Sequence, residues 1–322
     1  MFRLYLRSFS VFLLTVSCLE ASAQLIDNNS TFRTIHQKSY FRFHYDNDYF
    51  TKTDYYYTQG ITLEYVHPGL KKNPINKILI RPQHTDLKYG LSINLFGYTP
   101  TSILSDSILF GDRPYAAVID AGIFVTSTDP FHKKRISSTL SIGVIGPAGL
   151  GNEIQTGIHR WLKNPLPHGW QYQVKNDLVL NYRVNYEKQL LAAGHYFLLN
   201  GVGEAQAGTL NNSLGAGFNF LAGNFNDPYK VKNTKKIEYY FYGQARGNFI
   251  AYDAAMQGGL FSPKSPYTIS LGDIEHFTFR ADAGIIVNFK RLYLSYTQSF
   301  LSSEFRQGKY HRWGGVSIGF SF

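Results

Sequence analysis

The chain has 322 residues, with 32 Lys and Arg against 22 Asp and Glu, 44% hydrophobic residues and one Cys. Its 24 Tyr and 25 Phe exclude a disordered protein, and the single Cys excludes a disulfide scaffold or a cysteine-ligated metal site. A net charge of +10 first suggests a polyanionic partner, either nucleic acid or an anionic lipid surface.

Residues 1–23 have the pattern of a secretory signal peptide. Arg3 and Arg7 precede a short apolar stretch over 9–16, and Ala-Ser-Ala at 21–23 is typical of a cleavage site. A buried N-terminal helix is the alternative. Because export would separate the protein from DNA, we expect no nucleic-acid partner.

The remaining residues, 24–322, are expected to form one domain. Cys18 falls within the signal segment, and Thr15 stands where a lipidation signal favours an aliphatic residue. No later stretch approaches the ~20 consecutive apolar residues of a membrane-spanning helix. The mature chain is therefore soluble, surface-attached or a membrane β-barrel.

Alternation of apolar with polar or small residues favours the barrel. In 87–95, Leu, Tyr, Leu, Ile and Leu occupy every second position, and 178–187, 277–287 and 136–144 repeat the pattern. One apolar and one polar face per strand suit a barrel with lipid outside and a wet or polar interior. The final segment alternates in the same way and ends on Phe322, as the closing strand of an outer-membrane barrel usually does.

Twelve such segments predict an all-β fold, a twelve-stranded antiparallel transmembrane β-barrel with a short helix in an outer loop. An even number and a length near ~9–11 residues are typical of bacterial outer-membrane strands. A secreted β-sandwich is the alternative. The segments lie near 39–46, 57–66, 87–96, 115–126, 135–145, 176–187, 195–208, 213–222, 237–250, 276–287, 291–301 and 313–322.

If both termini lie in the periplasm, every connection from an odd to an even strand lies on the outer rim. The connection over 66–86 is long for an inner turn, and packing beneath the barrel is one explanation for its length. The outer connections are then 47–56, 97–114, 146–175, 209–212, 251–275 and 302–312.

The first outer connection begins with Asn47 and Asp48 and leads to Thr58. Carboxylate, amide and hydroxyl oxygens are the ligands that Ca²⁺ prefers. Asn and Asp are also common turn formers, and both interpretations stay open. In the second connection, Asp112 and Arg113 are interpreted as a local ion pair, with contact between Arg113 and a substrate phosphate as the alternative.

The third connection predicts a short helix from Glu153 to about Leu162, capped by Asn152. Gln155 and His159, four residues apart, share one face of this helix. His159 is a candidate general base because histidine titrates near neutral pH, and a surface histidine is the alternative. The remaining apolar side chains are expected to form a packed face, namely Ile154, Ile158, Trp161 and Leu162.

An ordered series of short motifs spans nearly the whole mature chain and closely resembles the outer-membrane lipid A 3′-O-deacylase family. Each motif is short, but their common order makes the resemblance specific. The motifs are Asn47-Asp48, Tyr57-Thr58-x-Gly60, Gly97-Tyr98-Thr99-Pro100, Gly111-Asp112-Arg113-Pro114-Tyr115-Ala116, Gly143-Val144-Ile145-Gly146-Pro147, Gly151-x-Glu153-x-Gln155-x-x-x-His159, Gly169-Trp170-x-x-Gln173 and Ser303-Glu304-Phe305-Arg306-x-Gly308.

The resemblance implies a Ca²⁺-dependent ester hydrolase that removes the 3′-linked acyloxyacyl chain of lipid A at a site between the barrel wall and the short helix. His159 would activate water, beside Asn47, Asp48 and Thr58, while Ca²⁺ stabilises the oxyanion. Metal ligands would come from Asp48, Asn47 and Glu153, and substrate contacts from Arg113 and Gln155. Two features depart from the family: 99–111 contains no Lys or Arg, and 163–165 reads Lys-Asn-Pro in place of an acidic ligand.

The expected partners are lipopolysaccharide and the lipid of the bacterial outer membrane, with the site facing the outer leaflet and the protein a monomer. A non-catalytic barrel of the same family, with a binding or structural role, is the main alternative. A serine-dependent lipase ranks lower, since no His is followed by x-Ser. A porin would need neither the His159 helix nor the ordered motifs.

Overall fold

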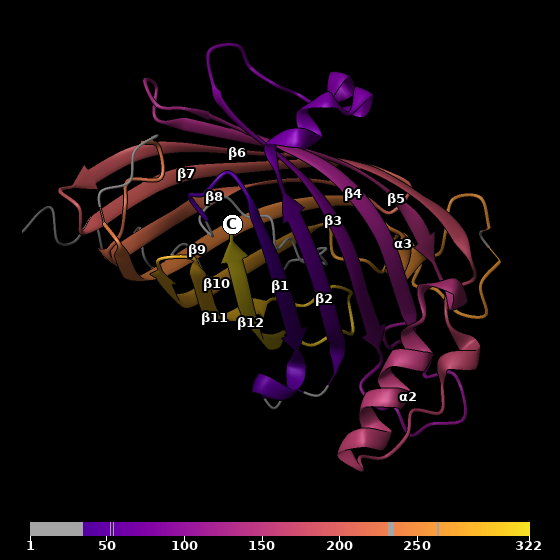
Figure 1. Ribbon diagram of the computed structural model, residues 1–322. Coiled ribbons are helices and arrows are strands. Elements are labelled where there is room, and N and C mark those ends of the chain that lie inside the picture. The colour runs from indigo at the N-terminus through magenta and orange to yellow at the C-terminus, as the bar shows by residue number, and fades with distance from the viewer. Residues whose placement is uncertain (1–34, 52, 54, 231–234, 263) are drawn as a thin grey trace, which may run out of the picture.

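Twelve antiparallel strands close into a barrel, in which each strand pairs with its neighbours in sequence and β1 pairs with β12 (Figure 1). The computed structural model describes residues 35–322 apart from 52, 54, 231–234 and 263. The predicted twelve-stranded fold is confirmed. The strands are β1 (Tyr40–Asn47), β2 (Tyr56–Val66), β3 (Asp86–Thr99), β4 (Ala116–Asp129), β5 (Lys134–Ile145), β6 (Asp177–Ala193), β7 (Phe197–Gly208), β8 (Asn211–Asn224), β9 (Ile237–Asp253), β10 (Phe277–Phe289), β11 (Leu292–Leu301) and β12 (His311–Ser321).

Each predicted segment overlaps one strand, but some strands extend further than the alternation indicates. Strand β6 continues to Ala193 because it still pairs with β7 beyond a bulge between Gln189 and Leu191. The predicted signal peptide, 1–23, lies outside the described residues. In the described part of the chain no helix has the length and apolar character needed to cross a membrane.

The barrel interior is polar, as the alternation predicts, and it is filled by side chains. Two buried ion pairs join neighbouring or nearby strands, Arg42 to Glu64 at 2.6 Å and Arg246 to Glu204 at 3.0 Å, and a third lies within β10, Arg280 to Asp282 at 2.8 Å. Pairing offsets the cost of removing these charges from water. This packing differs from the open, water-filled interior that a porin requires.

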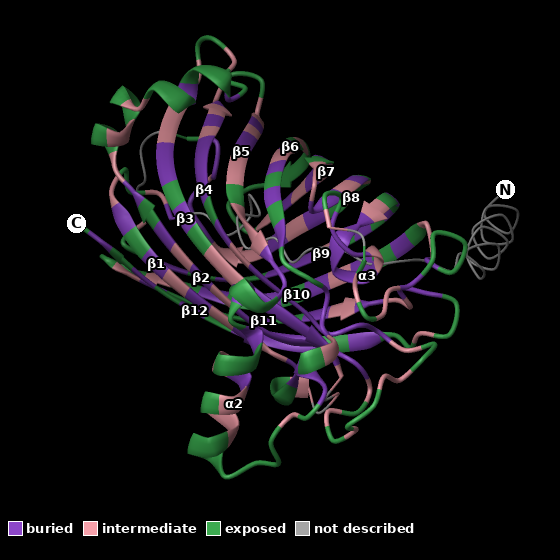
Figure 2. Cartoon of the chain, turned by 90° about the vertical axis from the view of Figure 1, so that its right-hand side faces the viewer, coloured by how far each residue is buried: buried purple, intermediate pink, exposed green. Residues whose placement is uncertain are grey.

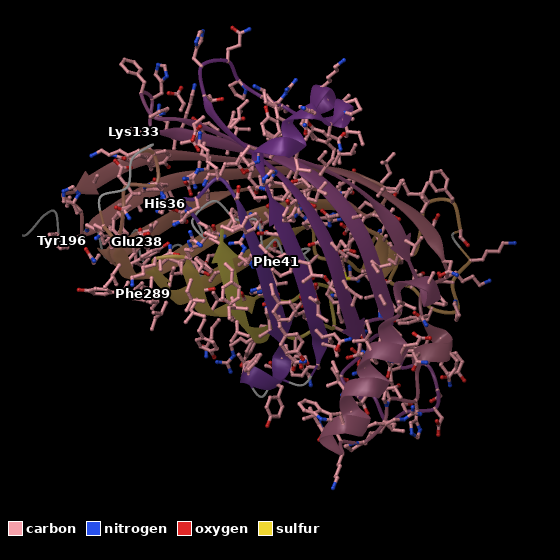
Figure 3. All side chains as sticks on the ribbon, viewed as in Figure 1. His36, Phe41, Lys133, Tyr196, Glu238 and Phe289 are labelled. Atoms are coloured by element: carbon pink, nitrogen blue, oxygen red, sulfur yellow. The ribbon has the colours of Figure 1, made fainter. Side chains whose placement is uncertain are left out.

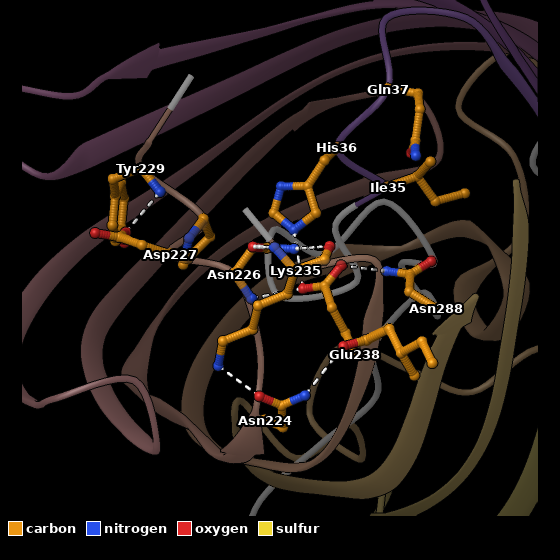
Figure 4. A network of polar contacts seen from close by, with 12 residues as sticks. Ile35, His36, Gln37, Asn224, Asn226, Asp227, Tyr229, Lys235, Glu238 and Asn288 are labelled. Carbon is orange, nitrogen blue, oxygen red and sulfur yellow. Dashed lines mark hydrogen bonds and ion pairs between the residues drawn. The ribbon is translucent and has the colours of Figure 1, made fainter. Parts of the chain in front are cut away.

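The described residues before β1, 35–39, lie inside the end of the barrel where β1 begins (Figure 4), and we call them the N-terminal segment. His36 Nε2 lies 3.3 Å from Glu238 Oε1, and the backbone N–H of Asn226 donates to the same carboxylate at 2.7 Å (Figure 4). Figure 3 shows His36 and Glu238 together, well away from helix α2. The Lys88 ammonium donates to the backbone carbonyl of Ile35 at 2.6 Å. These contacts tie the N-terminal segment to strands on both sides of the interior.

The long connection between β2 and β3 packs against the outside of the barrel wall. It contains two 3₁₀ turns, η2 (Pro68–Lys72) and η3 (Pro74–Ile78), and continues to a buried Leu79 that clusters with Tyr89 and Ile123. The Tyr182 hydroxyl on β6 donates to the carbonyl of Ile78 at 3.1 Å. The expectation that this connection packs beneath the barrel is wrong, because its apolar residues find partners on the wall.

The connections predicted to share one rim do lie together, at the end of the barrel that carries helix α2 (Gly151–Leu162) (Figure 1). Hydrogen bonds join them: the Gly111 N–H donates to the Tyr267 hydroxyl at 2.8 Å, and the His168 N–H to the Ile103 carbonyl at 2.8 Å. We call this end the α2 end. A second short helix there, α3 (Ala254–Gln257), follows β9 directly.

Candidate functional site

Helix α2 starts two residues earlier than the sequence predicts. A 3₁₀ turn, η4 (Pro147–Gly149), leads into it, and Leu150 occupies the N-cap position in a left-handed conformation. The predicted capping role of Asn152 is therefore wrong: Asn152 lies inside the first turn, where its Oδ1 accepts from the Thr156 hydroxyl at 3.2 Å. The helix ends at Leu162, and the residue that caps it, Lys163, also has a left-handed backbone conformation.

The start of α2 packs on the outward face of β4 through residues without bulky side chains. A Cβ at Gly151 would overlap both the ring of Trp170 and the methyl group of Ala117. Trp170 starts the 3₁₀ turn η5 (Trp170–Tyr172) and packs against Tyr115, with ring centroids 5.0 Å apart. Burial raises the pKa of the Tyr115 hydroxyl to about 12, so this contact stays uncharged.

Gln155 connects α2 to this packing. Its side chain is buried, and its Oε1 accepts a hydrogen bond from Trp170 Nε1 at 2.7 Å. The pair fixes the helix against the wall, and the predicted contact between Gln155 and substrate stays a prediction.

The predicted packed face of α2 is wrong. Its buried residues are Gly151 and Gln155, whereas Trp161 is 81% exposed and Leu162 is also exposed. Figure 2 shows most of the helix as exposed, projecting from the end of the barrel. Small residues at the wall allow close approach of the backbone, and of the bulky apolar side chains only Ile154 and Ile158 are half-buried.

His159 lies in the last turn of α2, with its ring oriented by the segment that follows the helix. Its Nδ1 lies 2.6 Å from the backbone carbonyl of Pro165. Because a carbonyl can only accept, Nδ1 carries the proton in this bond, and the neutral ring keeps the lone pair on Nε2. The chain reverses direction here through Lys163 and Asn164, whose N–H donates to the His159 carbonyl at 2.8 Å. This arrangement selects the tautomer that a general base requires.

Four residues form a row across the outward face of β1 to β4 near the α2 end. Asn47 is the register partner of Gln59, Gln59 of Gly97, and Gly97 of Ala117. We call these four residues the wall row. Trp170 lies over it, with its ring 3.7 Å from the position that a Cβ would take at Gly97. The wall row therefore runs from the loop after β1 to the start of α2.

Thr58 lies beside the wall row at a bulge in β2, between Tyr57 and Gln59. Its hydroxyl lies 2.6 Å from that of Thr99, the last residue of β3, and both side chains are buried. Bulges often occur next to active sites because they reorient side chains. The sequence contained Thr99 within a motif, but only the strand register shows that it contacts Thr58.

Asn47 adopts the turn-forming role that the sequence left open. Its Oδ1 accepts from the Tyr49 N–H at 2.8 Å, and its Nδ2 donates to the Tyr45 hydroxyl at 3.0 Å. The following Asp48 is buried and starts the 3₁₀ turn η1 (Asp48–Thr51). Both residues lie at the end of β1, one strand away from Thr58.

The chemistry of the donor set fits a calcium ion, which prefers hard oxygen ligands. The donors are the Asp48 carboxylate, the Thr58 hydroxyl and the second lone pair of the Asn47 amide oxygen. Within the described ranges, no group of three or more His, Cys, Asp or Glu side chains is close enough to share a metal ion. A cation here would take most of its ligands from hydroxyl, amide and backbone oxygens. Glu153 is exposed in the first turn of α2.

Arg113 is buried, and its guanidinium pairs with the Glu304 carboxylate. It also lies over the ring of Tyr98, 3.9 Å from the centroid. The predicted ion pair between Asp112 and Arg113 is wrong, since Asp112 Oδ2 instead accepts from the Thr101 N–H at 2.9 Å. Tyr98 points to the interior, opposite to Gly97, so Arg113 lies on the inner side of the wall from Thr58.

A serine, a histidine and an aspartate do form a hydrogen-bonded chain, inside the barrel. His44 Nδ1 lies 2.6 Å from the Ser317 hydroxyl, and His44 Nε2 lies 2.6 Å from Asp46 Oδ1. All three are buried, with Ser317 only 5% exposed. A nucleophile must be accessible to its substrate, so these residues serve to join β1 to β12 where the barrel closes.

Comparison with known proteins identifies the family. A sequence model described as "Outer membrane protein LpxR" matches residues 9–322. LpxR from Salmonella typhimurium has a similar structure, with a TM-score of 0.73 and 20% identity over 88% of this chain and 100% of the other. The COG4313 outer membrane channel from Pseudomonas putida F1 gives a TM-score of 0.47 at 12% identity, covering 93% and 100%. No curated protein sequence matches the chain.

The likeness to the Salmonella structure shows the fold, and the family model covers the predicted site residues from Asn47 to His159. The barrel, its short helix at one end and the ordered motifs agree with this match. The chain belongs to the LpxR family of outer-membrane proteins.

Proposed function

We propose that this protein is an ester hydrolase that removes the 3′-linked acyloxyacyl chain from lipid A. The observation that carries the proposal is the geometry of His159: the Pro165 carbonyl fixes its tautomer, and Gln155 and Trp170 anchor its helix to the wall. A net charge of +10 favours approach to phosphorylated lipid. The site would face the outer leaflet, with the protein acting as a monomer.

In the proposed reaction, Nε2 of His159 takes a proton from water as the water oxygen attacks the ester carbonyl carbon. The bond from that carbon to the sugar oxygen then breaks, and the protonated ring returns the proton to the leaving oxygen. The products are a free fatty acid and a hydroxyl group on lipid A.

Asp48, Asn47 and Thr58 would hold Ca²⁺, which when bound polarises the ester carbonyl. The Thr58–Thr99 contact keeps the start of β2 next to the end of β3, and so maintains the polar edge against which the ester would lie. Gln155 holds Trp170 over the wall row. Arg113 acts from the inner side of the wall, where it fixes the loop before β4 to Glu304.

Mass spectrometry of lipid A from cells expressing the protein tests the proposal. We expect the wild type to remove the 3′-linked chain and His159→Gln to lower the rate by about 10²–10⁴-fold, the contribution typical of a general base. His132→Gln is the matched control, because His132 is exposed at the opposite end of the barrel.

Unchanged lipid A in the presence of a folded wild-type barrel would reject the hydrolase and leave the non-catalytic barrel of the same family. Deacylation that persists in His159→Gln would reject the assignment of the base.

A further inference from the structure

Gln59 is a polar side chain on the outward face of β2, which is otherwise apolar from Ile61 to Tyr65. It lies in the wall row, between Asn47 on β1 and Gly97 on β3. Side chains alternate along a strand, so Gln59 points outward like Ile61, Leu63 and Tyr65. These three are the apolar residues expected on a lipid-facing wall, whereas Gln59 brings an amide to the place where α2 meets that wall.

The Gln59 amide nitrogen is buried and has no hydrogen-bond partner among the described residues. The whole side chain is 2% exposed. Buried polar groups are paired in nearly all native proteins, and an exception often marks a functional site. No structural contact of this amide explains its position.

In the structure, the side chains beside Gln59 are hydrogen-bonded to other residues. The Asn47 side chain is engaged with Tyr49 and Tyr45, and the Thr58 hydroxyl is paired with Thr99. On the other side, Gly97 contributes no side chain, and the Trp170 ring above it presents carbon atoms. The amide N–H₂ group is therefore a donor held ready at the polar edge of the wall.

We propose that the Gln59 amide donates a hydrogen bond to the carbonyl oxygen of the ester that is hydrolysed. The inference rests on the proposed hydrolase function and adds a specific donor to it. A donor fixed in a water-poor site stabilises the negative charge that develops on this oxygen during attack by water. Because Gln59 is buried and Trp170 covers the adjacent Gly97, the ester carbonyl reaches the amide when the Trp170 ring turns away from the wall row, while Gly151 keeps α2 against the wall.

The test measures kcat, KM and the calcium concentration for half-maximal rate with purified full-length protein and lipid A in detergent micelles. Gln59→Met keeps the length of the side chain and removes the donor. We expect kcat to fall by about 10²–10³-fold, as for loss of one oxyanion donor, with the calcium requirement unchanged. Gln59→Ala, which lacks most of the side chain, is expected to show the same loss of kcat.

Gln298→Met is the matched control. Gln298 is exposed on the outward face of β11 and lies in the same register series, since it pairs with Gly314, which pairs with Asn47. Its amide already donates to the Tyr296 hydroxyl at 3.0 Å. We expect this variant to keep the wild-type kcat.

If the wild type is active and both Gln59 variants keep its kcat, the inference about Gln59 is overturned, while the proposed hydrolase function stands. Activity restored in Gln59→Met by added calcium would also overturn it, since the amide would then serve the metal. A folded but inactive wild type would instead refute the hydrolase and the inference with it. Heat-dependent mobility in SDS gels confirms that each variant has a folded barrel.

Discussion

Arg113 and Glu304 illustrate how a buried charge depends on one distant partner. They are 191 residues apart in sequence and both are buried, so each is the main partner of the other's charge, while His311 Nδ1 lies farther from Glu304, at 3.9 Å. The Arg113 guanidinium also lies over the ring of Tyr98, which adds a cation–π interaction. The pair therefore fixes the connection before β4 to the connection before β12.

We expect Arg113→Met to lower the free energy of unfolding by about 3–5 kcal/mol, because it leaves Glu304 buried and unpaired. The measurement is urea-induced unfolding of the barrel in lipid vesicles. Adding Glu304→Gln to this variant removes the unpaired charge and is expected to recover most of the loss. A single variant as stable as the wild type would show that Glu304 takes another partner or a proton.

At the residue scale, the sequence identified His159 as a candidate base but not the group that orients it. Pro165 is only six residues away, yet its carbonyl reaches Nδ1 because Lys163 adopts a left-handed conformation. Non-glycine residues seldom adopt this conformation, so sequence patterns rarely predict it. In the same way, the sequence shows that Arg113 is charged but not that it pairs with Glu304.

Helix α2 depends on two glycines in different ways. Gly151 contacts the wall, where a Cβ would overlap Trp170 and Ala117, whereas a Cβ at Gly157 would have nothing within 4 Å. The helix therefore requires glycine at one position and tolerates a larger residue at the other.

We expect Gly151→Leu to displace α2 from the wall and lower deacylation at least about 10²-fold, since a misplaced catalytic group costs about that much in rate. Gly157→Ala is the matched control and should keep full activity, with α2 more stable by roughly 0.5–1 kcal/mol. Activity is read from lipid A mass spectra, with barrel folding checked separately. Full activity of Gly151→Leu would show that the position of α2 does not matter.

At the element scale, alternation predicts strands well because one face of each strand contacts lipid and the other is polar. The helix was harder to predict, since its wall-facing side is made of Gly151 and Gln155 rather than of apolar residues. The 3.6-residue pattern predicted the helix itself, but Trp161 and Leu162 of its apolar side are exposed. The alternation underestimated the length of β6, because the last residues of this strand pair with β7 beyond a bulge.

The whole barrel is stabilised by its closed sheet and by ion pairs in its interior, such as Arg42 with Glu64 and Arg246 with Glu204. The candidate calcium ligands are at the end of β1 and the start of β2, away from these pairs. Stability and metal binding are therefore expected to be separable.

We expect removal of Ca²⁺ with a chelator to abolish deacylation while the barrel stays folded. Activity should return when Ca²⁺ is added. Asp48 is the single acidic group among Asp48, Asn47 and Thr58, so Asp48→Asn should need a higher Ca²⁺ concentration to reach saturation. The assay follows free fatty acid at several calcium concentrations, with heat-dependent mobility in SDS gels as the folding control. Undiminished activity in excess chelator would exclude a calcium requirement, and unfolding would indicate a structural ion.

The sequence by itself determined the barrel, the number of strands and the segments that meet at the α2 end, because alternation and strand parity are local properties. Tertiary structure decided which residues face each other. Closure of the sheet sets the register that aligns Asn47, Gln59, Gly97 and Ala117, and folding of the connections pairs Arg113 with Glu304. These contacts join residues far apart in the chain, and their geometry depends on the whole closed barrel.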